Sequence, residues 1–543
     1  MIDLVIIGSG FGGAVMAARL TAALQLTHPG ARVVLLEQGD DPSGQFDPSS
    51  RGGPLNAQGN RFKNSLSPSY LSSVAELFTD TEQHFKRGSP SMTVATGRTL
   101  GGGSQVYDGV SLRAPTEAFG QVRDGNRLWP ATYSRASLDP YYAIAEARLR
   151  VKQLQWTDAS VPHWQLATRR DFIFAEGCRR IGATAVPLKV ADHDDANEGW
   201  WNEGQRFSGR QSLTQNYLLD AKRAGAEVWT GCQVDAIAPA GAGYVVRGID
   251  HRTQTPLELE CRLLIVAGGA VGSTALLLRS KDHFADGARA IDPSGLLGKH
   301  LSANGDYGVT GTIGAALAME VEGFKGKPMS SFCPSFFKQS QFILIPFYAA
   351  PLYLALSQFT TLMRAENPAA LGRGSTQAAT GERDWGLAYK QTLKSFGSRL
   401  LTMGCLALDS CEGEVHLGAR GVEVSWRESS RETEQRWSAA VEKMGRIYSA
   451  LGGEMFLDGY RKDGTVHTSH PLGGCRMGAD ATQGVVDAMG ESFRNPNLFV
   501  IDGAIIPSAL CANPSLTIAA LAESIAARLI NGQGTTSLRD RLA

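Results

Sequence analysis

The sequence lacks the features of a nucleic-acid-binding, zinc-binding or secreted protein. Lys plus Arg equals Asp plus Glu at 53 each, so no excess positive charge attracts a nucleic acid. The eight cysteines include no C-x-x-C pair and no zinc-ligand spacing, so we expect buried, reduced thiols. The first apolar run starts within three residues of Met1, which leaves no room for a signal peptide and predicts a cytoplasmic protein.

The long stretch from Gln341 to Met363 carries no charged residue. Its length is that of a membrane span, but Pro346 and Pro351 argue against one continuous helix. Three interpretations stay open. The stretch is core, which is the default, or it forms a wall of a cavity for an apolar substrate. The third is a hydrophobic lid that makes peripheral contact with a membrane through residues 341–363.

The N-terminal residues predict a strand, a helix and a second strand. Leu4 to Ile7 is a continuous apolar run, which is typical of a strand buried on both faces. Ala14 to Leu26 is rich in Ala, Leu and Met, which favour helix. Arg32 to Leu36 is a second apolar strand and ends on Glu37. This order is that of the first half of a nucleotide-binding domain.

Three glycines between the first strand and the helix have the spacing G-x-G-x-x-G. Gly8 permits a tight turn, Gly10 lets the backbone approach a pyrophosphate, and Gly13 lets helix and strand pack closely. The helix N-terminus attracts phosphate, and Glu37 stands where an acid accepts from ribose hydroxyls. The pattern predicts dinucleotide binding and does not separate FAD from NAD.

Further elements extend this pattern along the chain. Leu263 to Val266, the turn from Ala267 to Gly269 and a helix through Leu278 predict the second half of the nucleotide-binding domain. Asn513 is expected at the N-cap of a last helix, with Pro514 at its first position. Further predicted helices are 139–153, 211–224 and 429–451; further predicted strands are 227–229, 233–237, 244–249, 257–259 and 497–501, with a hairpin over 413–426.

Five motifs carry a resemblance to a known family. They are G-S-G-F-G-G at Gly8, G-R-T-L-G-G-G-S at Gly97, L-I-V-A-G-G-A-V-G-S-T-A-L-L-L at Leu264, H-P-L-G-G-C at His470 and N-P-S-L-T-I-A-A-L-A-E at Asn513. In this order they resemble the glucose–methanol–choline (GMC) oxidoreductase family, and most closely its cholesterol-oxidase-like branch. Residues 310–460 match only diffusely.

The resemblance implies the fold class and the domain organisation. We expect an α/β protein with an FAD-binding Rossmann-like domain and an intertwined α+β substrate domain built on an antiparallel sheet. The FAD-binding domain would comprise residues 1–140, 211–307 and 463–543. The substrate domain or lid would comprise residues 141–210 and 308–462.

The resemblance also implies bound FAD and hydride transfer from an alcohol carbon to the flavin N5. In the family, the two residues matching His470 and Asn513 face the flavin. A histidine suits the removal of the hydroxyl proton, which needs an acceptor within about 3 Å, and the Asn513 amide can hold the substrate oxygen. His467 lies three residues before His470, but no third ligand is apparent, so no metal site is predicted.

The other residues expected to contact the cofactor come from the same motifs and their flanks. They are Gly8, Gly10, Phe11, Gly12, Gly13, Glu37, Gln38, Gly102, Gly103, Ser104, Tyr107, Asp108, Gly109, Val234, Ala267, Gly268, Asp502, Gly503, Pro514 and Ser515.

Three features of the sequence bear on how closely it follows the family. The branch has an asparagine near the flavin where this chain has Tyr107, followed by Asp108. Some members bond FAD covalently through a histidine in the glycine loop; this chain has none there, so we predict dissociable FAD. A glutamate base in the substrate domain has only weak candidates, Glu320, Glu322 and Glu366.

The sequence as a whole predicts an FAD-dependent oxidoreductase that oxidises an alcohol to a carbonyl. The uncharged stretch suggests a bulky apolar alcohol, such as a sterol or terpenoid. The electron acceptor is oxygen or a quinone or carrier protein, and no motif decides between them. A non-redox flavoprotein of the lyase type on the same fold is the alternative, because a fold does not fix a function. An inactive flavin-binding protein is a third, less favoured interpretation.

Overall fold

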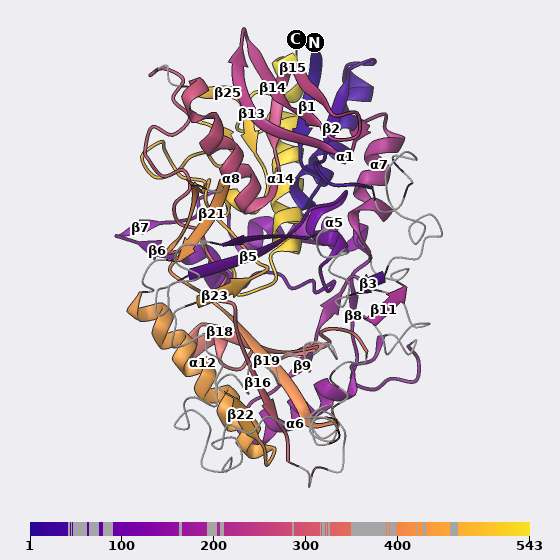
Figure 1. Cartoon of the computed structure of the whole chain (residues 1–543), viewed down its shortest axis with the longest axis vertical. Coiled ribbons are helices and arrows are strands. Elements are labelled where there is room, and N and C mark those ends of the chain that lie inside the picture. Colours follow the sequence, from indigo (N-terminus) through magenta and orange to yellow (C-terminus); the bar gives the residue numbers. More distant parts are fainter. Residues whose placement is uncertain are drawn as a thin grey trace.

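The structure is a computed structural model with two lobes, and both termini lie in the lobe drawn at the top of Figure 1. One large sheet forms the core of the upper lobe, and a smaller sheet with the helix α12 forms the lower one. The described residues are 1–41, 91–161, 165–192, 211–284, 287–314, 326–348, 398–419, 421–426, 430–456 and 465–542, the short pieces 62–64, 75–79 and 203–206, and the isolated residues 44, 46, 317, 321, 323, 387 and 390.

The upper lobe is built on an eight-stranded sheet in which a parallel part continues into an antiparallel part. Its parallel strands, in spatial order, are β12 (Glu227–Trp229), β2 (Val33–Leu36), β1 (Ile2–Ile7), β15 (Thr255–Val266) and β25 (Asn495–Val500). The antiparallel strands are β14 (Gly243–Asp250) and β13 (Cys232–Ala240) beside β15, and β24 (Glu491–Ser492) beside β25. The α/β expectation is confirmed.

The strand β15 belongs to both parts of this sheet. Its second half pairs with β1 in parallel, with Leu263 opposite Leu4 and Val266 opposite Ile7. Its first half pairs with β14 in antiparallel, with Thr255 opposite Asp250. The sequence predicted two separate strands here. They form one, because no turn residue interrupts the extended run between them.

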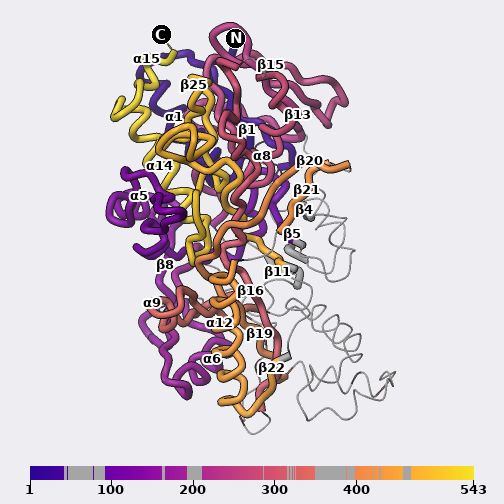
Figure 2. Tube along the Cα trace, turned by 90° about the vertical axis from the view of Figure 1, so that its left-hand side faces the viewer, coloured from indigo at the N-terminus to yellow at the C-terminus, as the bar shows by residue number. Residues whose placement is uncertain are grey.

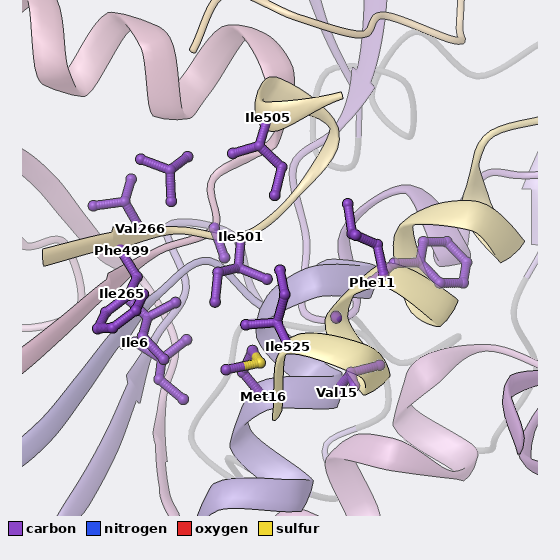
Figure 3. Close-up of a cluster of buried hydrophobic side chains, with 14 of the residues drawn as sticks. Ile6, Phe11, Val15, Met16, Ile265, Val266, Phe499, Ile501, Ile505 and Ile525 are labelled. Carbon is purple, nitrogen blue, oxygen red and sulfur yellow. The ribbon is translucent and has the colours of Figure 1, made fainter. Parts of the chain in front are cut away.

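Helices α1 (Phe11–Thr27) and α14 (Ser515–Asn531) lie side by side against the parallel strands (Figures 1 and 3). In Figure 3, side chains of α1 such as Val15 and Met16 meet Ile525 of α14 and strand residues such as Ile265. Val15, Met16, Ile265 and Ile525 are all fully buried. Burying this apolar surface holds the glycine turn after β1 and the start of α14 in one rigid frame.

The lower lobe carries a four-stranded antiparallel sheet. Its order is β18 (Phe342–Phe347), β19 (Leu400–Ala407), β16 (Tyr307–Thr312) and β22 (Glu454–Phe456), and α12 (Arg431–Ala450) packs on it. Ser430 caps α12 by accepting from the Thr433 backbone N–H. The antiparallel pairing of these four strands confirms the antiparallel sheet that was expected for this part of the chain.

Part of the uncharged stretch 341–363 is described. Residues 342–347 are the strand β18, whose first five residues are buried, so this part is core. Residues 349–363, and with them the proposed cavity wall or lid, lie outside the described residues. Within the described part of the chain, no helix combines the length and apolar character needed to cross a membrane.

Two predicted helices have different bounds. The helix predicted over 139–153 is α5 (Arg135–Arg148), which starts earlier because Ser134 and Ser137 form a capping box. The helix predicted over 211–224 is divided into a 3₁₀ turn, Leu213–Gln215, and α7 (Tyr217–Arg223). Asn216 interrupts it, because its side chain accepts from the Tyr217 N–H and its backbone leaves the helical region.

Smaller elements join the lobes and edge the sheets. The strands β23 (Thr465–Thr468), β5 (Ser91–Gly97) and β4 (Ala75–Thr79) form a sheet between the lobes (Figure 1). Figure 2 shows the two lobes from the side, with β20 and β21 at one edge. The remaining described elements are the pairs β3 (Phe62–Asn64) with β11 (Glu203–Arg206), β6 (Val122–Arg123) with β7 (Asn126–Arg127), β8 (Lys152–Gln153) with β10 (Lys189–Val190), β9 (Val186–Pro187) with β17 (Ser331–Phe332) and β20 (Gly413–Gly418) with β21 (Gly421–Trp426), and the helices α6 (Arg169–Arg180), α8 (Gly269–Ser280), α9 (Phe337–Ser340) and α15 (Leu538–Leu542).

Candidate active site

A cavity of about 540 Å³ opens at the ends of β1, β2 and β15, where their carboxyl termini meet. Ligands of open parallel sheets bind at this edge. Nineteen of the predicted site residues line it: Gly8, Gly10, Phe11, Gly12, Glu37, Gln38, Gly102, Gly103, Tyr107, Asp108, Val234, Ala267, Gly268, His470, Asp502, Gly503, Asn513, Pro514 and Ser515.

The glycines of the first turn divide into packing positions and one open position. A Cβ at Gly12 would stand 1.8 Å from the Ile501 carbonyl oxygen, and one at Gly13 would stand 2.0 Å from that of Gly8. Gly8 itself has a φ of +100°, which side chains rarely adopt. At Gly10, by contrast, no atom lies within 4 Å of the Cβ position. The backbone at Gly10 is therefore open to the cavity, beside the N-terminus of α1, as a dinucleotide phosphate requires.

Glu37, at the end of β2, is fastened to the same turn. Its Oε2 accepts from the Ser9 N–H at 3.2 Å and from the Ser9 hydroxyl at 2.5 Å, and its Oε1 accepts from the Gly39 N–H at 2.8 Å. The Ser9 hydroxyl accepts in turn from the Gly101 N–H at 2.8 Å, so the two glycine loops are joined. Burial raises the pKa of Glu37, against the effect of these donors. Ser9 was not predicted, and only its place between two motif glycines could have indicated it.

Asp502, which follows β25, joins three segments on the other side of the cavity. Its carboxylate accepts from the Gly269 N–H at 2.7 Å, from the Ser273 hydroxyl at 2.6 Å and from the Ala504 N–H at 2.7 Å. Burial raises the pKa of Asp502, although these three donors favour its charged form. The start of α8 is thus held against the segment after β25.

His470 lies in the cavity wall and is oriented by a carboxylate. Its Nδ1 is 2.9 Å from each carboxylate oxygen of Asp306, at the start of β16. Because a carboxylate only accepts, Nδ1 carries the hydrogen and leaves Nε2 as the basic nitrogen. Burial disfavours the imidazolium, but the charge of Asp306, its hydrogen bond and the charge of Asp108 outweigh burial and raise the pKa of His470.

Asn513 contacts His470 directly, since its Nδ2 donates to His470 Nε2 at 3.0 Å. The prediction that Asn513 caps the last helix was wrong: Pro514 is the flanking residue, α14 starts at Ser515, and no side chain caps it. Asn513 Oδ1 is buried and has no hydrogen-bond partner among the described residues. The amide is therefore committed to the histidine, with one acceptor left for a ligand.

Three predicted cofactor residues do not line the cavity. Gly13 packs against the turn after β1, as expected for the third glycine. The Ser104 hydroxyl donates to the Gly101 carbonyl and accepts from the Leu213 N–H, so it holds the second glycine loop together. The Gly109 carbonyl accepts from the Ala191 N–H. His467 is exposed on β23 and does not line the cavity.

Some residues of the site were missed by the sequence analysis. Asp306 was missed because it lies 164 residues before His470 in a segment without a motif. Val106, Val110 and Met329 add apolar surface to the cavity. The weak candidate bases Glu320, Glu322 and Glu366 lie outside the described residues.

Comparisons with known proteins cover nearly the whole chain. Two profiles described as GMC oxidoreductase match residues 3–288 and 404–522. The long-chain-alcohol oxidase FAO4B of Arabidopsis thaliana is 23% identical, over 97% of this chain and 67% of that protein. A cholesterol oxidase of Mycobacterium tuberculosis (strain CDC 1551 / Oshkosh) is 25% identical, over 99% of this chain and 92% of that protein.

A solved structure agrees with the fold. The crystal structure of pyridoxine 4-oxidase from Mesorbium loti matches with a TM-score of 0.62 at 17% identity, over 98% of this chain and 99% of that chain. At this identity the likeness concerns the fold alone. On the two profile matches and the alcohol-oxidising relatives, the chain belongs to the GMC oxidoreductase family and is an FAD-dependent alcohol oxidoreductase.

Proposed function

We propose that this protein oxidises a bulky apolar alcohol to a carbonyl compound, with His470 as the base and oxygen as the electron acceptor. The carrying observation is the partly buried chain of hydrogen bonds from Asp306 through His470 to Asn513 at the wall of the cavity. The names of the relatives, a long-chain-alcohol oxidase and a cholesterol oxidase, support the apolar substrate and the acceptor. The apolar side chains of Val106, Val110 and Met329 on the cavity wall support the same substrate class.

The residues fit FAD, and we propose that it is held without a covalent bond. The open position at Gly10 and the N-terminus of α1 would take the pyrophosphate, Glu37 the ribose, and the start of α14 the flavin. When bound, FAD supplies the acceptor for the hydride that leaves the alcohol carbon. No histidine stands in the glycine loop from Gly97 to Gly109 to form a covalent bond.

The protein's own side chains remove the hydroxyl proton of the alcohol. His470 Nε2 takes the hydroxyl proton, and the Asp306 carboxylate at Nδ1 stabilises the imidazolium that results. The raised pKa of His470 fits this role, because a more basic imidazole takes the proton more readily. Asp306 also fixes the tautomer in which Nε2 carries no hydrogen and acts as the acceptor.

Asn513 serves the same proton transfer from the other side. In the arrangement described here it donates Nδ2 to the neutral Nε2. Because Nε2 has a single lone pair, the amide rotates away before Nε2 takes the hydroxyl proton. The protonated Nε2 is then a donor, and Oδ1, which has no partner in the arrangement described here, accepts from it. Nδ2 then points into the cavity, where it can hold the product oxygen.

The proposed division of the chain is the one that the sequence predicts. Residues 1–140, 211–307 and 463–543 would bind FAD, and residues 141–210 and 308–462 would bind the substrate. A cytoplasmic location and a peripheral membrane contact through residues 341–363 stay predictions from the sequence.

An anaerobic titration of the purified flavoprotein against alcohols tests the function. The panel runs from sugars and choline through straight-chain alcohols to sterols, and absorbance of the oxidised flavin band is followed. We expect an apolar alcohol to bleach the band, and admission of air to restore it within the turnover time. The His470→Gln variant, which should retain FAD, is the control for bleaching by contaminants.

Other outcomes decide between the alternatives. Bleaching by sugars or choline alone would contradict the apolar substrate. A band that returns with a quinone but not with air would contradict oxygen as the acceptor. No bleaching by any alcohol would favour the non-redox, lyase-type function. Acid precipitation of the protein should release the flavin into the supernatant; a yellow pellet would contradict non-covalent binding.

A further inference from the structure

One short segment, residues 301–306, forms hydrogen bonds with the chain on either side of His470 and with the loop that precedes Asn513. Toward His470, the Ser302 N–H donates to the Leu472 carbonyl at 2.7 Å, and the Ala303 carbonyl accepts from the Thr468 hydroxyl at 3.0 Å. The same hydroxyl accepts from the His470 N–H at 2.8 Å. Asp306 ends the segment at the His470 imidazole.

Toward Asn513, the contact is made by a single side chain, that of Asn304. Its Nδ2 donates to the Ala512 carbonyl at 2.8 Å, and its Oδ1 accepts from the N–H groups of Leu510 at 2.8 Å and Cys511 at 3.1 Å. Asn304 is fully buried. The side-chain amide of Asn304 thus forms hydrogen bonds with residues 510–512, and Asn513 follows directly in the chain.

The loop held by Asn304 needs such support. Cys511 has a left-handed φ of 51°, which a residue with a side chain adopts only when contacts hold it there. Asn304 itself has a φ of 57°, which asparagine tolerates better than most residues. Without the Asn304 amide, two buried N–H groups and one carbonyl of the loop would lose a partner.

Asn304 is in turn anchored by a buried carboxylate. The Asn304 N–H donates to the Ser302 hydroxyl at 2.9 Å, and that hydroxyl lies 2.8 and 2.9 Å from the two oxygens of Asp409. Asp409 also accepts from the N–H groups of Gly305 and Cys411, each at 2.9 Å. These hydrogen bonds hold the backbone of the turn that carries Asn304, so they restrict movement of the Asn304 side chain.

We propose that Asn304 is a positioning residue for catalysis, which sets the distance between the Asn513 amide and the His470 imidazole. This inference rests on the proposed function of His470 and Asn513. The segment 301–306 touches the histidine through Asp306 and the loop before Asn513 through Asn304, so it holds the two side chains in one register. A misplacement of about 1 Å at a catalytic group costs on the order of 10²-fold in rate.

A double-mutant cycle of Asn304→Ala and Asn513→Ala tests the proposal. We expect Asn304→Ala to lower kcat roughly 10- to 100-fold with little change in KM, because the loss concerns the transition state. In the Asn513→Ala background, Asn304→Ala should change kcat less than about 2-fold, because the group that it positions is gone. Equal losses in both backgrounds, or no loss in either, would contradict the proposal.

Asn495→Ala is the matched control for a general loss of stability. Asn495 is also fully buried, and its Nδ2 donates to the Arg289 carbonyl at 3.0 Å, outside the cavity lining. We expect it to lower Tm as Asn304→Ala does and to leave kcat unchanged. If kcat falls equally in both variants, Asn304 acts only through stability and the proposal is wrong.

One further variant and the Asn513→Ala single variant keep the outcomes distinct. If Asn304→Ala does not fold, Asn304→Asp retains the acceptor for Leu510 and Cys511 and removes the donor to Ala512, so the same cycle is run with it. Wild-type turnover of Asn513→Ala would contradict the proposed function of Asn513 and the role of Asn304 together. A loss in Asn513→Ala with additive effects of Asn304→Ala would contradict the positioning role alone.

Discussion

The imidazole of His470 and the carboxylate of Asp306 form a partly buried pair in which Nδ1 lies 2.9 Å from both carboxylate oxygens. The pair joins the start of β16 in the lower lobe to the segment after β23 between the lobes. The proposed base is therefore held by the residue that directly precedes β16, a strand of the lower sheet. The basicity of His470 and its position depend on the same contact.

Replacing Asp306 should move the pH dependence of the reaction. The base works as the neutral imidazole, so kcat/KM falls as the pH drops below the raised pKa of His470. Asp306→Asn removes the charge that raises this pKa, and we expect the acidic limb to shift to lower pH. The plateau should also fall roughly 10- to 100-fold, because a hydrogen bond to a charged group contributes about 1.5–3 kcal/mol. Profiles of kcat/KM from pH 5 to 9 check both effects.

The matched control for this experiment is Asp250→Asn. Asp250 ends β14 and forms a hydrogen bond with Arg252; its neighbour across the sheet, Cys232, lines the cavity, but Asp250 itself does not. It should leave the acidic limb in place. An unmoved limb in Asp306→Asn would mean that the limb reports another group.

Replacing His470 should separate cofactor binding from turnover. His470→Gln and His470→Ala should retain FAD and lower turnover roughly 10²- to 10⁴-fold, the usual contribution of a general base. The measurements are the flavin absorbance of the purified variants and their kcat. His416→Gln, on the strand β20, should behave like the wild type. Full turnover in either His470 variant would remove this residue from the mechanism.

Substitution of two glycines of the first turn by alanine should have different effects, one on FAD affinity and the other on stability. Gly10 has a φ of −67° and free space at its Cβ position, so Gly10→Ala should fold with the Tm of the wild-type apoprotein. Its methyl group should lower FAD affinity by roughly 10-fold or more, because backbone approach to the pyrophosphate is lost. Gly12→Ala places a Cβ 1.8 Å from the Ile501 oxygen and should lower stability by about 1–3 kcal/mol. Apoprotein Tm and FAD titration by flavin fluorescence give both quantities. Undiminished FAD affinity in Gly10→Ala would place the phosphates elsewhere.

Removing the Glu37 carboxylate should loosen the turn and the cofactor together. Glu37→Ala leaves the N–H groups of Ser9 and Gly39 without their acceptor, which costs about 1–3 kcal/mol of stability. FAD affinity should fall as well, since the ribose loses its acceptor. Glu227→Ala removes a surface carboxylate paired with Arg32 and should cost about 1 kcal/mol or less. Denaturant unfolding and FAD titration of both variants test the contrast; equal losses would contradict it.

The sequence predicted most of the upper lobe, because its signals are local. Apolar runs such as Leu4–Ile7 predicted strands, and the glycines that follow predicted the turn at the cavity. The sequence predicted helix boundaries less well where a single polar side chain sets the end of the helix through a hydrogen bond to the backbone. Ser134 moved the start of α5, and Asn216 divided the helix predicted over 211–224.

The site divides in the same way between sequence and tertiary structure. The amino-acid sequence by itself determined the glycine turn and Glu37, because their spacing has a chemical reason. It also gave the candidates His470 and Asn513, because their motifs resemble those of the family. Only the tertiary structure decided what holds them. Asp306 and Asn304 lie 164 and more than 200 residues from their partners, in a segment without periodicity or motif. Hydrogen bonds between residues so distant in the sequence form only in the folded tertiary structure, so no local sequence pattern predicts them.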